Sequence, residues 1–413
     1  MPEAKPRAPS IPLLFAMLYA GQLASNIYVP GIPDIARDLD TTVSAAQTLV
    51  AAYLGAFAVA QMIIGPLSDR FGRRPVIVGG LSVFVVASLV CAVVPDIGTL
   101  LLARFAQAFG ACATIVVGRA MIRDTSEGVA AAQAMSWLAT AMGIGPATAP
   151  FFGGFLTSWF GWQSTFLATA LVGTCVLIFV IIDLKETLPP AMRRPQRIWP
   201  LIRTYWRLAG NPVFVGYSLI VSFGSGAMQT YLTSVPIVFL VLMHVPPELF
   251  GVYIMIMPML YVVATYTSRQ LMGRMSVDRI ILIGSIFSIC GGVLQLAFGL
   301  WGVTTPYPVL IAFAISNFGT GLVFGNCYAQ ALSTVEPAIA GQASALGGFF
   351  HMGWGACISL FAASMTHTSS LQFGIAQMVT TSLAAATAFA LFFYIKPRMR
   401  SEGGKKHGVW SDG

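Results

Sequence analysis

Twelve long apolar stretches dominate this sequence, and each could cross a lipid bilayer as a helix, which takes roughly 20 residues. Only 9% of the 413 residues are charged, against roughly 25% in soluble proteins. Because lipid offers the backbone no hydrogen-bond partners, each segment must satisfy its own polar groups, which favours helices. We therefore expect an all-α polytopic membrane protein with twelve spans, near residues 11–33, 44–65, 75–94, 98–121, 129–158, 162–183, 212–240, 248–267, 279–301, 306–330, 340–364 and 371–395.

The longest polar stretch is rich in proline and arginine, and it divides the spans into six and six. The two sets share faint echoes: Tyr28-Val29-Pro30 with Ser234-Val235-Pro236, and Arg70…Gly80 with Arg274…Gly284. Such echoes are typical of parallel repeats that rock against each other. We predict an N-terminal six-helix half at 1–184, a cytoplasmic linker at 185–211, a C-terminal six-helix half at 212–395 and a cytoplasmic tail at 396–413.

The lysines and arginines are unevenly distributed between the loops. Nearly all of them fall in alternate loops, in the linker and in the tail, whereas only Arg37 lies in a segment predicted for the other side. Because cytoplasmic loops of membrane proteins carry an excess of Lys and Arg, both termini are expected in the cytoplasm. The net charge of +8 therefore reflects topology, and we expect no nucleic-acid partner.

One loop, residues 65–75, reads Gly-Pro-Leu-Ser-Asp-Arg-Phe-Gly-Arg-Arg-Pro. Its glycines allow two helix ends to come close, and its aspartate can pair with an arginine. The loop resembles the signature between the second and third helices of the major facilitator superfamily of secondary transporters. That resemblance implies a cytoplasmic gate, in which we expect Asp69 and Arg73 to form a latch against a helix start near Glu336–Gly341. The candidate gate residues of this loop are Gly65, Asp69, Arg70, Gly72, Arg73 and Arg74.

The fifth span carries small residues every four positions, which lets helix backbones approach closely. It resembles the fifth-helix motif of drug:proton antiporters in the same superfamily, most clearly at Gly145-Pro146 and Gly153-Gly154. Its prolines remove helical hydrogen bonds and are expected to bend or soften the helix. We expect this helix to lie between the two rocking halves.

The first span contains Ser25-Asn-Ile-Tyr-Val-Pro-Gly-Ile-Pro33, which resembles the first-helix motif of the Bcr/CflA group of bacterial drug-resistance transporters. The stretches 104–110, 118–124, 185–190 and 340–346 fit the same group. The resemblance implies proton-coupled export of small amphipathic compounds across the bacterial inner membrane. A protein of this kind is expected to be a monomer and not an enzyme, with no cofactor and no bound metal.

The sequence departs from that group at Asn26, where its members usually carry an aspartate. Asparagine can hydrogen-bond a ligand but cannot take up a proton. The other titratable candidate is His351 in the eleventh span, and an unperturbed imidazole titrates at about pH 6.5. His351 is thus either a neutral core residue or the group that binds substrate or carries the proton.

Arg104 lies inside the fourth span, and Gln107 shares its helix face. The family motif places Arg104 toward the central cavity, where it could attract an anionic substrate, although its stem could also reach outward. Polar and aromatic residues near the midplane are the candidates for substrate binding or coupling, and each could instead join helices. They are Asn26, Tyr28, Tyr53, Gln61, Arg104, Gln107, Gln229, Tyr231, Asn317, Asn326, His351 and Trp354.

Three alternatives stay open. The missing acid allows import, or facilitated diffusion or exchange without protons. A cluster of Met255, Met257 and Met259 offers soft ligands that would suit a copper ion as substrate. A membrane enzyme or receptor could share the composition, but membrane enzymes normally gather His, Asp or Glu at the active site, and this chain shows no such cluster in its spans.

Overall fold

The computed structural model describes residues 9–126, 128–190, 193, 198–336, 339–365 and 369–398. The first half contains α1 (Ile11–Asn26), η1 (Val29–Gly31), α2 (Ile32–Asp38), α3 (Val43–Phe71), α4 (Arg73–Val93), α5 (Ile97–Thr125), α6 (Gly128–Phe160) and α7 (Gln163–Asp183). A shorter helix, α8 (Ile198–Ala209), follows in the linker. The second half contains α9 (Pro212–Pro236), η3 (Ile237–Leu242), α10 (Pro247–Leu271), α11 (Val277–Leu300), α12 (Pro306–Ser333), α13 (Ala340–Ser364), α14 (Leu371–Ala390) and η5 (Leu391–Ile395).

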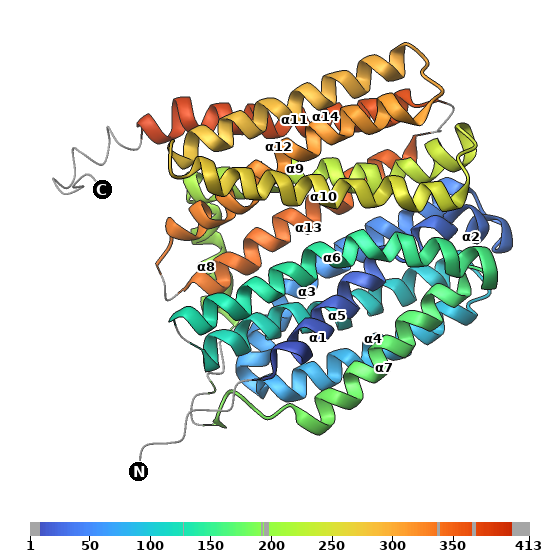
Figure 1. Ribbon diagram of the computed structural model, residues 1–413. Coiled ribbons are helices and arrows are strands. Elements are labelled where there is room, and N and C mark those ends of the chain that lie inside the picture. Colours follow the sequence, from blue (N-terminus) through green and yellow to red (C-terminus); the bar gives the residue numbers. More distant parts are fainter. Residues whose placement is uncertain are drawn as a thin grey trace.

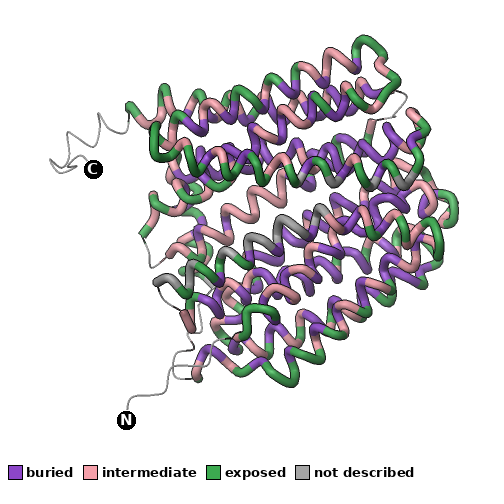
Figure 2. Tube along the Cα trace, in the orientation of Figure 1, coloured by how far each residue is buried: buried purple, intermediate pink, exposed green. Residues whose placement is uncertain are grey.

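The predicted all-α fold with twelve spans is confirmed. Within the described residues, ten helical segments are long and apolar enough to cross a membrane, and α6 and α10, with 33 and 25 residues, complete the set. Large apolar side chains such as Val93, Leu171 and Ile182 are exposed on the outer surface (Figure 2). An apolar outer surface is stable only with lipid as the solvent.

The first span is longer than predicted and changes course near its end. The α-helix stops at Asn26, and the chain passes through η1 into α2, so that the span runs from Ile11 to Asp38. Pro30 and Pro33, which lack a backbone N–H, explain why one regular helix does not continue through this region.

Side-chain caps help to set where several spans begin. Thr42 accepts a hydrogen bond from the Ala45 amide at 3.1 Å, and Asp96 accepts one from the Thr99 amide at 2.9 Å. Such caps satisfy amides that have no partner within the helix. The hydrogen bonds from the Thr99 side chain and amide hold the pKa of Asp96 below its usual value.

The predicted internal repeat reappears in how the helices cross. A Cβ on Gly110 in α5 would overlap the carbonyl of Gly80 in α4, and a Cβ on Gly319 in α12 would overlap the carbonyl of Gly284 in α11. Both pairs of neighbouring helices therefore cross with their backbones in close contact at glycine. The echo at Gly80 and Gly284 thus marks equivalent packing in the two halves.

The two halves lie side by side, with the first half blue to green and the second yellow to red (Figure 1). Helix α3 contacts α13, and α6 contacts α10. We call the end that carries α8 the linker end. At the opposite end Gln47 Nε2 donates to Thr233 O at 2.6 Å, and Ser44 Oγ donates to Ala363 O. Toward the linker end α6 and α10 diverge (Figure 1). These two helices therefore approach each other most closely at the end opposite α8.

The linker contains more structure than its composition predicted. Helix α8 buries Tyr205 and Leu208, and the Tyr205 hydroxyl donates to Met62 O in α3 at 3.5 Å. Leu201 packs in the same cluster, which includes residues of α9 and α13. Helix α8 of the linker therefore packs against both halves of the molecule.

Candidate transport site and gate

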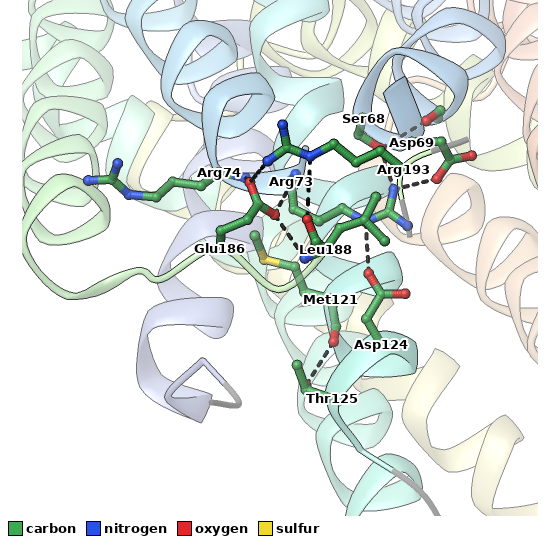
Figure 3. Close-up of polar contacts among 11 residues, drawn as sticks. Ser68, Asp69, Arg73, Arg74, Met121, Asp124, Thr125, Glu186, Leu188 and Arg193 are labelled. Atoms are coloured by element: carbon green, nitrogen blue, oxygen red, sulfur yellow. Dashed lines mark hydrogen bonds and ion pairs between the residues drawn. The ribbon is translucent and has the colours of Figure 1, made fainter. Parts of the chain in front are cut away.

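Arg73 is the centre of the predicted gate. Although charged, it is only 4% exposed, and its Nη1 donates to Asp69 Oδ1 and to Ser68 Oγ, both at 2.6 Å (Figure 3). Its Nε donates to Asp124 Oδ2 at 2.8 Å. Two carboxylates and a hydroxyl thus surround one guanidinium, which is the arrangement that stabilises a buried arginine.

Glu186 caps the start of α4. Its Oε1 accepts from the Arg73 amide at 2.9 Å, and its Oε2 accepts from the Arg74 amide at 3.3 Å (Figure 3). A carboxylate is favourable there because helix N-termini carry partial positive charge. The Arg74 guanidinium in turn donates to Leu184 O at 2.8 Å and Ile181 O at 2.9 Å. The gate loop is therefore fastened to the end of α7.

Gly72 is the glycine of this loop that the geometry requires. Its φ is +103°, in a region that side chains rarely adopt, and a Cβ there would overlap Glu186 Oε2. Gly65 has no comparable constraint, because the nearest atom to a Cβ would be Val116 Cγ1 at 3.9 Å. Arg70 points outward, with its guanidinium 5.1 Å from the Phe71 ring centre.

The structure shows the expected Asp69–Arg73 pair but places the latch differently. The described contacts of Arg73 all lie in the first half, so Arg73 does not hold the start of α13. Arg123 is the side chain that approaches there, with Nη1 3.4 Å from where a Gly341 Cβ would lie. Asp124 and Glu186 were not named as gate residues, although both lie in stretches that carried the family resemblance.

Arg104 occupies an aromatic cage inside the first half. Its guanidinium carbon lies 4.2 Å from the ring centre of Tyr28, 4.3 Å from Tyr53 and 5.8 Å from Phe166. Nη1 donates to Ala24 O at 2.9 Å and to Gln107 Oε1 at 2.5 Å. The side chain is fully buried, so the expectation that it faces the central cavity is wrong for this structure.

The cage holds a positive charge with little neutralisation. Within the described residues Arg104 forms no ion pair, and its Nε and Nη2 make no hydrogen bond. A desolvated cation over an aromatic ring gains about 2 kcal/mol or more, and here three rings face it. The rings and two oxygen acceptors therefore take the place of a counter-ion.

Asn26 does not belong to this cage. Within the described residues, the hydrogen bonds and ring contacts of Arg104 do not include the Asn26 side chain. The Asn26 side chain is 6% exposed and donates from Nδ2 to Ser25 Oγ at 2.6 Å. The structure therefore separates Asn26 from Arg104.

Helix α13 carries the polar and aromatic side chains nearest to the contact between the halves. Its residues 347–354 are all half-buried (Figure 2). Gln61 of α3 packs directly over Gly348, where a Cβ would overlap Oε1. His351 lies 5.4 Å from the Phe324 ring of α12. Gln61 of the first half and His351 of the second thus lie along the same helix contact.

Two further predicted residues lie at this helix, Trp354 on α13 itself and Gln229 on the neighbouring α9. Trp354 Nε1 donates to Thr380 Oγ1 at 3.0 Å, and its ring meets Phe223 edge-to-face at 4.7 Å. Gln229 packs against Gly355, with Cγ 3.2 Å from where a Cβ would lie. A small pocket lies between α9, α12 and α13, closer to the linker end, and Gly347 lines it.

Other candidates lie inside the second half. Tyr231 stacks on Phe313 with ring centres 3.9 Å apart. Asn317 Nδ2 donates to Met257 O at 2.7 Å, and Asn326 Nδ2 donates to Ser268 Oγ at 2.8 Å. These two amides join α12 to α10, which is the common role of amides in membrane helices.

The methionines of α10 do not support the copper alternative. Met257 is 1% exposed and packs in the core, whereas Met259 is 66% exposed. The side chain of Met255 lies outside the described part of the structure. Met257 and Met259 therefore point in different directions and cannot hold one ion together.

The glycines of α6 contact α1 and not the second half. A Cβ on Gly153 would overlap Ile27 O, and a Cβ on Gly145 would overlap the Gln22 side chain. The expectation that this helix lies between the halves agrees with the contact of α6 with α10, whereas the close approach at these two glycines is to the first span. Gly154 accepts a hydrogen bond from Ser158 Oγ at 2.8 Å, and the Pro146 side chain lies outside the described residues.

The fold and the gate are those of a membrane transporter built from two sets of spanning helices. A sequence profile of the Major Facilitator Superfamily matches residues 14–360, and the chain belongs to this family. It is 30% identical to multidrug resistance protein D of Escherichia coli (strain K12), over 85% of this chain and 87% of that protein. It is 25% identical to the bicyclomycin resistance protein homolog of Haemophilus influenzae, over 92% of this chain and 94% of that protein.

Solved structures of the superfamily share the fold. The D-xylose-proton symporter matches with a TM-score of 0.75 at 16% identity, covering 93% of this chain and 97% of that one. At this identity the match concerns the fold alone. Together with the relatives above, it confirms the prediction of a major facilitator transporter of the Bcr/CflA drug-resistance type.

Proposed function

We propose that this protein exports small amphipathic molecules across the bacterial inner membrane by alternating access. The observation that carries this proposal is the half-buried run of residues 347–354 in α13, which lies against the other half of the molecule. Aromatic and amide side chains there offer apolar area with few fixed charges, which suits amphipathic compounds. Whole-length similarity to proteins named for multidrug and bicyclomycin resistance supports export.

We further propose that the linker end faces the cytoplasm and that the protein works as a monomer without a cofactor. The basic residues of the gate, of α8 and of the segment after α14 gather at this end, as the positive-inside rule requires. In this orientation the Arg73 cluster fastens the cytoplasmic ends of α3, α4, α5 and α7 into one body. That body moves against the second half during transport.

Proton coupling is proposed to run through His351. Asn26 cannot ionise, and His351 lies beside Phe324 at the contact between the halves. An imidazole can take up and release a proton, which the Asn26 amide cannot do. The lack of an acid at Asn26 favours one second candidate, which is export or exchange without protons.

Proton release on substrate binding distinguishes these two mechanisms. Detergent-solubilised protein in weak buffer, scanned from about pH 4 to about pH 7, should release up to about one proton per molecule when an amphipathic compound binds at a pH where His351 is protonated, because binding excludes that proton. His351→Gln should release none. His244→Asn is the matched control, since His244 is exposed in a loop, and it should release as much as wild type.

Unchanged release in His351→Gln would rule out His351 as the coupling group. Asn26→Asp should add a releasing carboxyl group if the first-helix site is otherwise intact. Binding without release in wild type, together with release in Asn26→Asp, would establish the proton-independent alternative.

A further inference from the structure

Helix α8 presents an unusual outer face. Trp199 is 80% exposed and Trp206 is 75% exposed, while Tyr205 and Leu208 on the other side are buried. At 100° per residue, the two tryptophans lie within roughly 20° of each other around the helix. Arg203 lies roughly 60° from Trp206 around the helix. Arg207 lies roughly 40° beyond Arg203, on the side away from the tryptophans. The exposed face therefore has an aromatic centre with a basic flank.

Exposing this face of α8 to water is energetically unfavourable. Each tryptophan presents about 200 Å² or more of side-chain surface, and apolar area stabilises by roughly 25 cal/mol per Å² when it leaves water. Within the described residues, neither Arg203 nor Arg207 forms an ion pair, and both are exposed. Two unpaired guanidinium groups beside two exposed indoles require a partner that is apolar at its centre and anionic at its edge.

The position of α8 identifies the partner. The helix lies at the linker end and runs across the direction of the spanning helices (Figure 1), so it lies parallel to the membrane plane. Its inner face is held to the protein through Tyr205 and Met62. An in-plane helix with Trp on its apolar face and Arg on its polar face is typical of the headgroup region of a bilayer.

We propose that α8 is a lipid-binding helix, in which Trp199 and Trp206 insert into the headgroup region of an anionic leaflet and Arg203 and Arg207 bind lipid phosphates. The proposal concerns a surface remote from the contact between the halves. It does not depend on which compound is exported or on how export is driven.

Quenching of tryptophan emission by brominated lipids tests this inference. The full-length protein is reconstituted with brominated phosphatidylglycerol or with brominated phosphatidylcholine. The chain has eight tryptophans, so the emission of Trp199 and Trp206 is the difference between wild type and the double variant Trp199→Phe/Trp206→Phe. We expect the anionic brominated lipid to quench this difference at least twofold more strongly than the zwitterionic one.

A charge-matched pair of variants isolates the arginines. Arg203→Gln/Arg207→Gln should abolish the preference for the anionic lipid, because the phosphate contacts are lost. Arg269→Gln/Arg274→Gln removes the same charge from exposed positions at the same end and should leave the preference intact. Equal loss in both pairs would reduce the effect to net charge and overturn the proposed site.

The remaining outcomes also decide the question. If aqueous iodide quenches the difference emission and neither brominated lipid does, the face is in water and the proposal is wrong. If none of the quenchers reaches it, protein covers the face, as a second copy of the chain would, and the proposal is equally wrong.

Discussion

Gly153→Ala should lower the melting temperature of the detergent-solubilised protein by about 3–4 °C. A Cβ at this position would overlap Ile27 O, and that atom is backbone that no rotamer change can move away. Helices α1 and α6 would have to separate by more than an ångström. Overpacking of this kind typically costs 1–3 kcal/mol, and we expect about 3 kcal/mol, which corresponds to a shift of that size.

Gly79→Ala is the matched control. It also places a methyl group on a helical glycine, but no atom lies within 4 Å of its Cβ. Alanine is favoured over glycine in a helix interior by up to about 1 kcal/mol, so this variant should melt no lower than wild type. Loss of helical ellipticity on heating measures both variants. Equal melting of Gly153→Ala and wild type would contradict the close approach of α1 and α6.

Arg104→Glu should prevent folding, whereas Arg104→Met should fold. The aromatic rings around the guanidinium turn their electron-rich faces toward it; they belong to Tyr28, Tyr53 and Phe166. Ala24 O and Gln107 Oε1 also accept hydrogen bonds from it. A carboxylate in this place would meet only groups that repel it. A buried charge left without compensation costs about 3–5 kcal/mol, a large part of the stability of a domain.

Methionine has a similar length and removes the charge, and replacing buried ions by apolar residues is often neutral or stabilising. The yield of monodisperse protein on size exclusion measures folding, and we expect at least a tenfold loss for Arg104→Glu. Arg269→Glu reverses a charge at an exposed position and should retain the wild-type yield. A normal yield of Arg104→Glu would show that the rings and oxygens do not enclose this side chain as described.

The span count and the two halves could be predicted because they depend on local composition. Each span satisfies its own backbone, so hydropathy alone reveals it. The Asp69–Arg73 pair was equally accessible, since the two residues are four apart in the chain. The amphipathic pattern of Ile198–Ala209 was also present in the sequence, but the prediction gave this segment only as a linker and did not specify a helix.

The partners that come from distant segments could not be predicted. Glu186 caps α4 from beyond the end of α7, and nothing in its local sequence specifies that contact. The neighbours of Arg104 come from α1, α3 and α7, so the cage exists only after the helices pack. The small-residue spacing around Gly153 correctly predicted that another backbone approaches there. It could not predict which helix approaches, because spacing within one helix contains no information about its neighbours.

Counterflow in proteoliposomes tests the central claim most directly. Vesicles that contain the protein are loaded with an unlabelled amphipathic compound and diluted into a trace of the same compound with a label. A transporter that alternates between two sides exchanges one for the other, so we predict transient accumulation of label inside for at least one compound of a drug-like panel. The absence of accumulation for every compound under any ion gradient, with protein shown to be folded, would contradict the account.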